Sequence, residues 1–207
     1  MNLHEYQAKD ILKKFDLPIL KGQSYENSIQ SLEKDLLELQ GPPWVIKSQI
    51  HAGGRGAGYF KNPFNDKGGV QVVFEKENVS KIAKSMMGNT LITKQTGENG
   101  KKVNRVFIEE GCEIDKEFYL SLLVDRNSSK LMMIVSAEGG MDIEEVAKHN
   151  PEKIFKIYFE NFEEKEIPKE LETKLGFTNS QFFEFSKIVF KLIKSFKSID
   201  ASTIEIN

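Results

Sequence analysis

Two long stretches of the chain repeat apolar residues at steps of three and four, the spacing of a helix with one buried face. The first repeat covers residues 3–15 and stops before Asp16-Leu17-Pro18, because proline cannot continue a helix. The second repeat predicts the longest helix, over residues 179–198. Shorter repeats predict helices over residues 28–39 and 79–87.

Short apolar runs between turn residues predict the strands. They cover residues 44–47, 69–74, 104–109, 117–124, 130–136 and, with strict alternation, 202–207. The turn at residues 125–129 joins two of these strands into a hairpin, and residues 59–67 are predicted to form an extended loop. Helices and hairpins are mixed without the regular alternation of a parallel sheet, which favours an α+β fold over a Rossmann fold.

The composition is that of a folded globular protein, with 39% hydrophobic and 29% charged residues among 207. The net charge of -2 provides no overall field for nucleic acid or anionic lipid, and no run of about 18 apolar residues predicts a membrane span. Cys112 is the single cysteine, which excludes an internal disulfide and indicates a reducing compartment, the cytoplasm or the mitochondrial matrix. No positive charge adjoins its thiol, so we expect a structural role for it.

A glycine loop, His51-Ala52-Gly53-Gly54-Arg55-Gly56-Ala57-Gly58, follows the predicted strand at residues 44–47. Glycines let backbone N–H groups approach phosphate oxygens, and Lys47 and Arg55 could neutralise the phosphate charge. The spacing matches neither the Walker motif nor the dinucleotide-binding fingerprint. An ordinary flexible turn remains the alternative.

Acidic residues mark the ends of predicted strands, where carboxylates can bind ribose, an adenine amino group or Mg²⁺. They are Glu109, Glu110, Glu113 and Glu117. In the last strand Glu205 and Asn207 share one face and supply the oxygen ligands that Mg²⁺ prefers. Singly, each of these residues is also typical of a solvated surface.

The three histidines lack the spacing of a zinc site. We expect His4 and His149 to be surface or helix-end residues. His51, beside the glycine loop, could border a site.

Five motifs, in order along the whole chain, resemble the β subunit of the ADP- or GDP-forming succinyl-CoA synthetases (succinate–CoA ligases). They cover residues 1–9, 45–56, 116–120, 136–140 and 204–207. The resemblance implies an ATP-grasp fold, in which two α+β lobes enclose a nucleotide. It assigns residues 1–20 and 111–207 to a larger lobe and residues 21–110 to an inserted smaller lobe.

The resemblance also implies a role for each matched residue. Binding of ATP or GTP would involve Lys47, Gly54, Arg55 and Gly56 at the phosphates, Glu109 and Cys112 beside the base and ribose, and Glu117. Asn207 would bind Mg²⁺, and Glu205 would be the catalytic residue that positions the phosphohistidine loop of a partner α subunit.

The implied reaction of the α and β subunits interconverts succinate, CoA and a nucleoside triphosphate with succinyl-CoA, a nucleoside diphosphate and phosphate. The sequence stops at Asn207, where the family continues into a further domain, so we expect no ligase activity from this chain alone. No nucleic acid or membrane partner is expected. A malate- or citrate-CoA ligase β subunit and a stand-alone nucleotide-sensing module remain alternatives.

Overall fold

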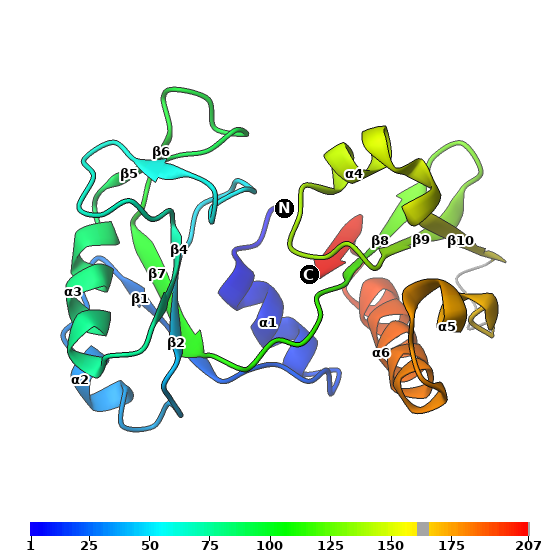
Figure 1. Ribbon diagram of the computed structural model, residues 1–207, viewed down its shortest axis with the longest axis horizontal. Coiled ribbons are helices and arrows are strands. Elements are labelled where there is room, and N and C mark those ends of the chain that lie inside the picture. Colours follow the sequence, from blue (N-terminus) through cyan, green and yellow to red (C-terminus); the bar gives the residue numbers. More distant parts are fainter. Residues whose placement is uncertain (161–165, 207) are drawn as a thin grey trace. The chain divides into compact units, whose positions relative to one another are not determined.

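The computed structural model describes residues 1–160 and 166–206, and the chain divides into two compact units (Figure 1). Unit 1 comprises Met1–Ile11 and Pro18–Glu113, and unit 2 comprises Leu12–Leu17 and Ile114–Asn207. The first eleven residues thus group with unit 1, whereas the family's layout places residues 1–20 in the larger lobe. The lobe boundaries implied by the resemblance stay a prediction.

Unit 1 is built on a four-stranded antiparallel sheet in the order β1-β7-β2-β4. Its strands are β1 (Gly22–Glu26), β2 (Trp44–Ser48), β4 (Val70–Val73) and β7 (Arg105–Glu110). A smaller antiparallel sheet contains β3 (Tyr59–Phe60), β5 (Thr90–Ile92) and β6 (Lys101–Lys102).

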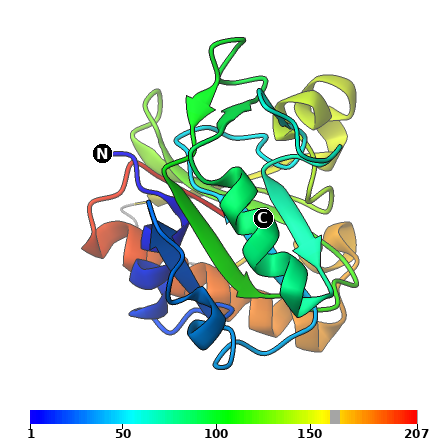
Figure 2. The same cartoon turned by 90° about the vertical axis from the view of Figure 1, so that its left-hand side faces the viewer.

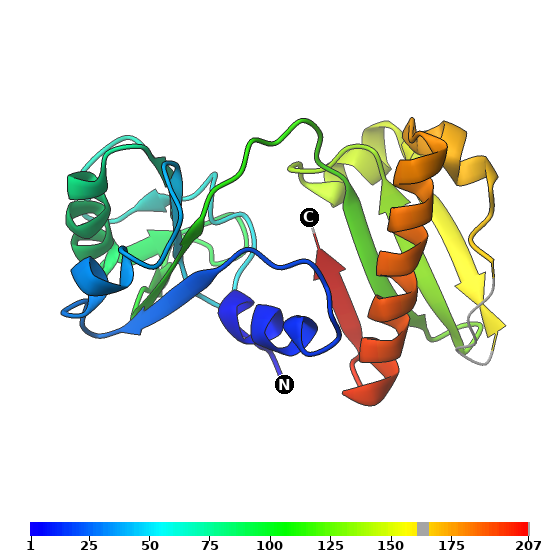
Figure 3. The same ribbon diagram turned by 90° about the horizontal axis from the view of Figure 1, so that it is seen from below.

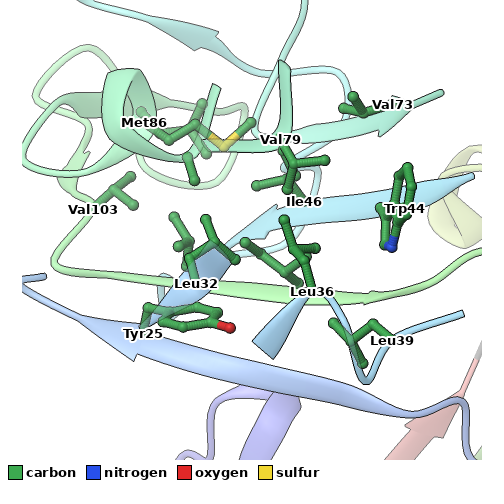
Figure 4. Packing of buried hydrophobic residues seen from close by; sticks show 14 of the residues in the cluster. Tyr25, Leu32, Leu36, Leu39, Trp44, Ile46, Val73, Val79, Met86 and Val103 are labelled. Carbon is green, nitrogen blue, oxygen red and sulfur yellow. The ribbon is translucent and has the colours of Figure 1, made fainter. Parts of the chain in front are cut away.

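One face of the larger sheet carries the core of unit 1. In β2 alternate residues are buried, so that Trp44 and Ile46 point into the core while Lys47 points to the other face. Helices α2 (Leu32–Asp35) and α3 (Lys76–Met86) cover the apolar face, and Figure 2 shows α3 lying across it. Figure 4 shows strand and helix side chains interdigitating in this core.

Unit 2 contains a four-stranded antiparallel sheet in the order β10-β9-β8-β11. Its strands are β8 (Tyr119–Asp125), β9 (Lys130–Ser136), β10 (Phe155–Phe159) and β11 (Thr203–Ile206). The sheet is flanked by α6 (Asn179–Ser198), as Figure 3 shows, together with α5 (Glu170–Leu175), α4 (Ile143–His149) and a short 3₁₀ helix, η1 (Pro151–Lys153).

Helix α6 has the predicted boundaries because both its start and its buried face are encoded locally. Thr178 and Gln181 form a reciprocal capping box at its N-terminus. Phe185, Val189 and Leu192 recur at helical spacing and are buried. The prediction of this helix is confirmed, as are those of α1 (Glu5–Lys13), α3 and the hairpin of β8 and β9.

The predicted helix over residues 28–39 is wrong in length, since α2 contains four residues. Leu32, Leu36 and Leu39 are all buried. Leu36 and Leu39 follow α2, however, and reach the core from successive turns and not from a continued helix. Strand β1 was missed because Tyr25 is its single buried residue, and its pairing with β7 is a long-range interaction. In the predicted loop at residues 59–67, the first two residues form β3.

No helix in the described ranges has both the length and the apolar character needed to cross a membrane.

The core of unit 1 gives a test of the packing. Ile46 is completely buried, so Ile46→Ala should lower the free energy of unfolding of this unit by roughly 2–5 kcal/mol, measured by urea denaturation. Val72→Ala is the matched control, because Val72 lies on the neighbouring strand and is 47% exposed. Equal losses for the two variants would contradict this assignment of the core.

Candidate functional site

A buried carboxylate organises the polar face of the larger sheet in unit 1. Glu109, on β7, has a side chain that is only 3% exposed and forms ion pairs with Lys9 of α1 and Lys47 of β2. A carboxylate buried to this degree needs such partners, because desolvation of an unpaired charge is costly. Glu109 therefore fixes α1 against the two central strands.

Glu5 links the same lysine to the glycine loop. Its carboxylate lies 2.9 Å from Nζ of Lys47 and 2.7 Å from Nη2 of Arg55. It also lies 3.4 Å from Nζ of Lys9, one helical turn away. Nη1 of Arg55 donates to the carbonyl of Ser48 at 2.8 Å, so its guanidinium is held from two sides.

We call Glu5, Lys9, Lys47, Arg55 and Glu109 the charged cluster. Three cations and two anions give it a net charge of +1. Burial alone would raise the pKa of Glu5, but the charges of Lys47, Arg55 and Lys9 outweigh it and lower the pKa to about 2. Burial alone would lower the pKa of Lys47, whereas the charges of Glu5 and Glu109 raise it. Both groups are therefore ionised at neutral pH.

The backbone of the glycine loop is held by hydrogen bonds on either side of Gly54. Gly53 N–H donates to the side chain of Gln95 at 2.7 Å. The carbonyl of Arg55 accepts from the N–H groups of Gly58 and Gly69. Gly54 has φ +68° and faces open space, a conformation in which a side chain would be strained. The loop is therefore shaped by its backbone and not by packing around Gly54.

Three backbone donors at the tip are available. In the described part of the chain, the N–H groups of Gly54, Arg55 and Gly56 have no hydrogen-bond acceptor. Together with the charges of Lys47 and Arg55, such N–H groups suit an anionic oxygen ligand such as phosphate. The structure thus brings these four predicted site residues into one part of unit 1.

Glu109 is buried, whereas its position at a strand end is also typical of a solvated carboxylate. Its oxygens are occupied by two lysines in this structure, and it acts as a support for Lys47. Cys112, two residues beyond β7, is an exposed free thiol. The predicted proximity of both residues to a base and ribose stays a prediction.

In unit 2, Glu117 lies against a pair of glycines that follows β9. Gly139 N–H donates to the carbonyl of Glu117 at 3.3 Å. A Cβ atom at Gly139 would collide with the backbone of Glu117, and one at Gly140 with its carboxylate. The motif at residues 136–140 therefore needs glycine at positions 139 and 140, because their backbone lies too close to Glu117 for a side chain.

Glu205 lies on β11 opposite Ser121 of β8. Burial raises the pKa of the Tyr119 phenol, the hydroxyl of Ser121 lowers it, and the charge of Glu205 raises it further. Glu205 itself is exposed. Its role in catalysis stays a prediction.

The predicted Mg²⁺ ligand Asn207 lies outside the described residues. Within the described ranges, no group of three or more His, Cys, Asp or Glu side chains is arranged to hold a metal ion.

Sequence reasoning missed Glu5 and Lys9 as members of a site. Their four-residue spacing in the first helix was the available signal, but the same spacing is common on solvated helices. Only the long-range pairing with β2 and β7 distinguishes the two cases.

A family model described as the ATP-grasp domain matches residues 2–207. The chain is 48% identical, over its whole length, to the succinate–CoA ligase [ADP-forming] β subunit of Rhodospirillum rubrum and 47% identical to that of Paramagnetospirillum magneticum. It covers 52% of each relative, so the chain spans about half the length of the curated relatives it matches. The resemblance inferred from the five motifs is confirmed.

Among solved structures, ATP citrate lyase from Methanothrix soehngenii, in complex with citrate and coenzyme A, has a TM-score of 0.70 to this chain. The sequence identity is 16%, and the match covers 99% of this chain and 46% of the other. This likeness concerns the fold alone, and it agrees with the predicted ATP-grasp fold.

The low pKa of Glu5 predicts acid sensitivity of unit 1. A carboxylate whose pKa falls from 4.5 to about 2 on folding contributes roughly 3 kcal/mol above pH 4.5, and that contribution disappears as the pH falls towards 2. Glu5→Gln should therefore be less stable than the wild type at pH 6, and the difference should shrink below pH 4.5. Urea denaturation across this pH range measures it.

Glu98→Gln is the control for that series, because Glu98 is exposed in the same unit. A stability difference between wild type and Glu5→Gln that does not change with pH would disprove the role assigned to the Glu5 carboxylate.

Proposed function

This chain belongs to the ATP-grasp family, and from that membership we propose that it is the nucleotide-binding portion of a succinate–CoA ligase β subunit. The observation that carries the proposal is that two kinds of donor occur together. The positive side chains are those of Lys47 and Arg55. The backbone N–H groups are those of Gly54, Arg55 and Gly56, which have no acceptor among the described residues. Positive side chains from β2 and the glycine loop, together with backbone donors of that loop, are suited to the phosphates of a nucleoside triphosphate.

We propose ATP as the nucleotide, in preference to GTP. The support comes from the names of the relatives, which are ADP-forming enzymes. Cys112 and Glu109 are the residues proposed to lie near the base and ribose.

Phosphate binding would require a change in the ion pairs that Glu5 forms with Lys47 and Arg55. Glu5 already bridges Lys47 and Arg55 at hydrogen-bonding distance, as a phosphate oxygen would. A bound phosphate would share these cations with Glu5 or replace it. Glu109 would keep Lys47 in place during that exchange, because it pairs with the same ammonium group from the buried side.

Three residues of unit 2 have proposed roles of their own. Glu117 would contact the nucleotide, and Glu205 would position the phosphohistidine loop of a partner α subunit. Asn207 would hold Mg²⁺, whose charge would stabilise the phosphoryl group during transfer. Glu205 supplies a carboxylate two residues away from Asn207, which is compatible with a magnesium site.

The activity of the whole protein is likewise a proposal. The α and β subunits together would convert succinate, CoA and ATP to succinyl-CoA, ADP and phosphate, with a phosphohistidine on the α subunit as the intermediate. We place this complex in the cytoplasm, or in the mitochondrial matrix of a eukaryote. The acid substrate depends on parts of the subunits beyond these residues, and assaying the complete complex with succinate, malate and citrate would identify it.

Nucleotide binding by this chain tests the central claim. Isothermal titration with ATP and with GTP, each with and without Mg²⁺, should show saturable binding of ATP. Lys47→Ala should weaken it at least about tenfold, equivalent to roughly 1.4 kcal/mol, because a charge partner of the phosphates is lost.

Lys81→Ala is the matched control, since Lys81 is exposed on α3 and its side chain makes no ion pair within the described residues. Circular dichroism should show that both variants are folded. Equal ATP affinity in the wild type and Lys47→Ala would refute the phosphate site, and tighter binding of GTP would refute the adenine preference.

The role of Glu205 is tested in the complex of complete α and β subunits. Glu205→Gln should reduce phosphorylation of the α subunit by ATP at least about a hundredfold, while the affinity for ATP stays within about twofold. Glu152→Gln, at an exposed position of unit 2, should leave both unchanged. Wild-type phosphorylation in Glu205→Gln would remove this residue from the mechanism.

A further inference from the structure

Beyond the charged cluster, the polar side of unit 1 contains a pocket that the proposed function does not use. Its volume is about 390 Å³, which is within the range of pockets for small molecules. It is lined on one side by His4, just before α1, by Tyr6 of α1 and by Gln49, just after β2. Lys101 and Lys102 of β6 and Arg105 of β7 line the other side. None of the five residues of the charged cluster lines it.

The charge of the pocket is positive. Lys101, Lys102 and Arg105 contribute three positive charges, and Glu26 contributes one negative charge. Arg105 pairs with Glu26 and lies 4.7 Å from the ring of Tyr6, so its position is fixed. With neutral histidines, a net charge of +2 remains.

Two of these three cations, Lys101 and Lys102, have no carboxylate partner in the described part of the chain. Nζ of Lys101 donates to the carbonyl of His51 at 3.0 Å, a neutral acceptor that orients the side chain. Lys102 forms no ion pair or hydrogen bond through its side chain among the described residues. Both lysines are exposed, and within the described residues no carboxylate competes with an incoming anion for their ammonium groups.

Two histidines stack at the edge of this pocket. The rings of His4 and His51 are parallel to within 14°, with centroids 3.9 Å apart. His4 Nδ1 is buried and has no hydrogen-bond partner in the structure as described. His4 directly precedes α1, and its carbonyl accepts the N–H of Ala8, so it is a helix-end residue as expected. The residue is partly buried and not fully exposed.

We infer that this pocket is a second anion site of unit 1, which binds a small molecule through a phosphate or carboxylate group. Lys101 and Lys102 would supply ammonium donors, and Arg105 would supply a fixed positive charge behind them. The imidazole of His4 would donate from the edge of the pocket once protonated. This arrangement of several cations around a preformed polar cavity is chemically suited to a dianion.

The pocket is separate from the proposed phosphate site. Arg105 and Glu109 lie four residues apart on β7, and a strand rises about 3.3 Å per residue, so their Cα atoms are roughly 13 Å apart. The side chains of both residues lie on the sheet face that α1 covers. Two anions can therefore occupy this face at the same time.

Anion binding should be linked to protonation of His4. Burial lowers the pKa of His4, and the charges of His51, Arg105 and Arg55 lower it further, while Glu26 raises it. An anion would offset these positive charges and favour the protonated imidazole. Affinity should therefore rise as the pH falls through the pKa of the histidine.

Histidine NMR can test the site directly, because the sequence has only three histidines. Inorganic phosphate and malonate would be titrated separately at constant ionic strength, with chloride as the balancing salt. The imidazole signals of His4 and His51 should shift saturably with one or both anions. Malonate, which is mainly a dianion at both pH values, should bind more tightly at pH 6 than at pH 8. His149, exposed in unit 2, is the internal control and should not shift.

Paired variants separate this site from the charged cluster. Replacing Lys101 and Lys102 together by Ala should weaken the phosphate or malonate response roughly tenfold or more. Lys47→Ala should leave it unchanged, and Lys81→Ala is the surface control. The inference is wrong if the signals of His4 and His51 do not saturate with either anion, or if the response persists in the double variant. Loss of the response in a Lys47→Ala variant that has the circular dichroism spectrum of the wild type would mean that the anion binds in the charged cluster instead.

Discussion

The ion pairs of Glu109 are the interaction on which the candidate site depends. A carboxylate that is 3% exposed is stable only while Lys9 and Lys47 remain beside it, because an unpaired charge at that depth would cost several kcal/mol. The same two contacts bring together a helix near the N-terminus, a central strand and a strand 100 residues along the chain. The position of Lys47 is thus a consequence of the fold of the whole unit and not of the glycine loop alone.

Alternation along the strands divides the larger sheet into two faces with different tasks. Trp44 and Ile46 enter an apolar core that α2 and α3 complete, and this packing fixes β2. Lys47, between Ile46 and Ser48 in sequence, is then directed to the opposite face by the geometry of the strand. A rigid core on one side is therefore what holds charged groups in a defined place on the other.

The sequence was sufficient for elements whose signals are local. The buried stripe and capping box of α6 are both contained within its own residues, and the alternation of β2 is visible in five residues. It was insufficient where long-range partners decide the outcome. Glu5 and Lys9 look like an ordinary solvated pair until β2 and β7 provide their partners, and β6 is a strand of two lysines. The resemblance to relatives identified Lys47 and Arg55, but not the carboxylate that lies between them.

That carboxylate, Glu5, lets the two cations of the proposed phosphate site lie close together without destabilising the fold. Without Glu5, Lys47 and Arg55 would repel each other in a partly buried position, and the glycine loop would lose its contact with α1. With Glu5, the cations stay ordered, but an incoming anion must compete with an internal one. In the proposed phosphate site, the binding free energy would be the difference between two sets of ion pairs, so the affinity would depend on α1 as much as on the loop. A helix with the contacts of a structural support would then be part of the binding equilibrium.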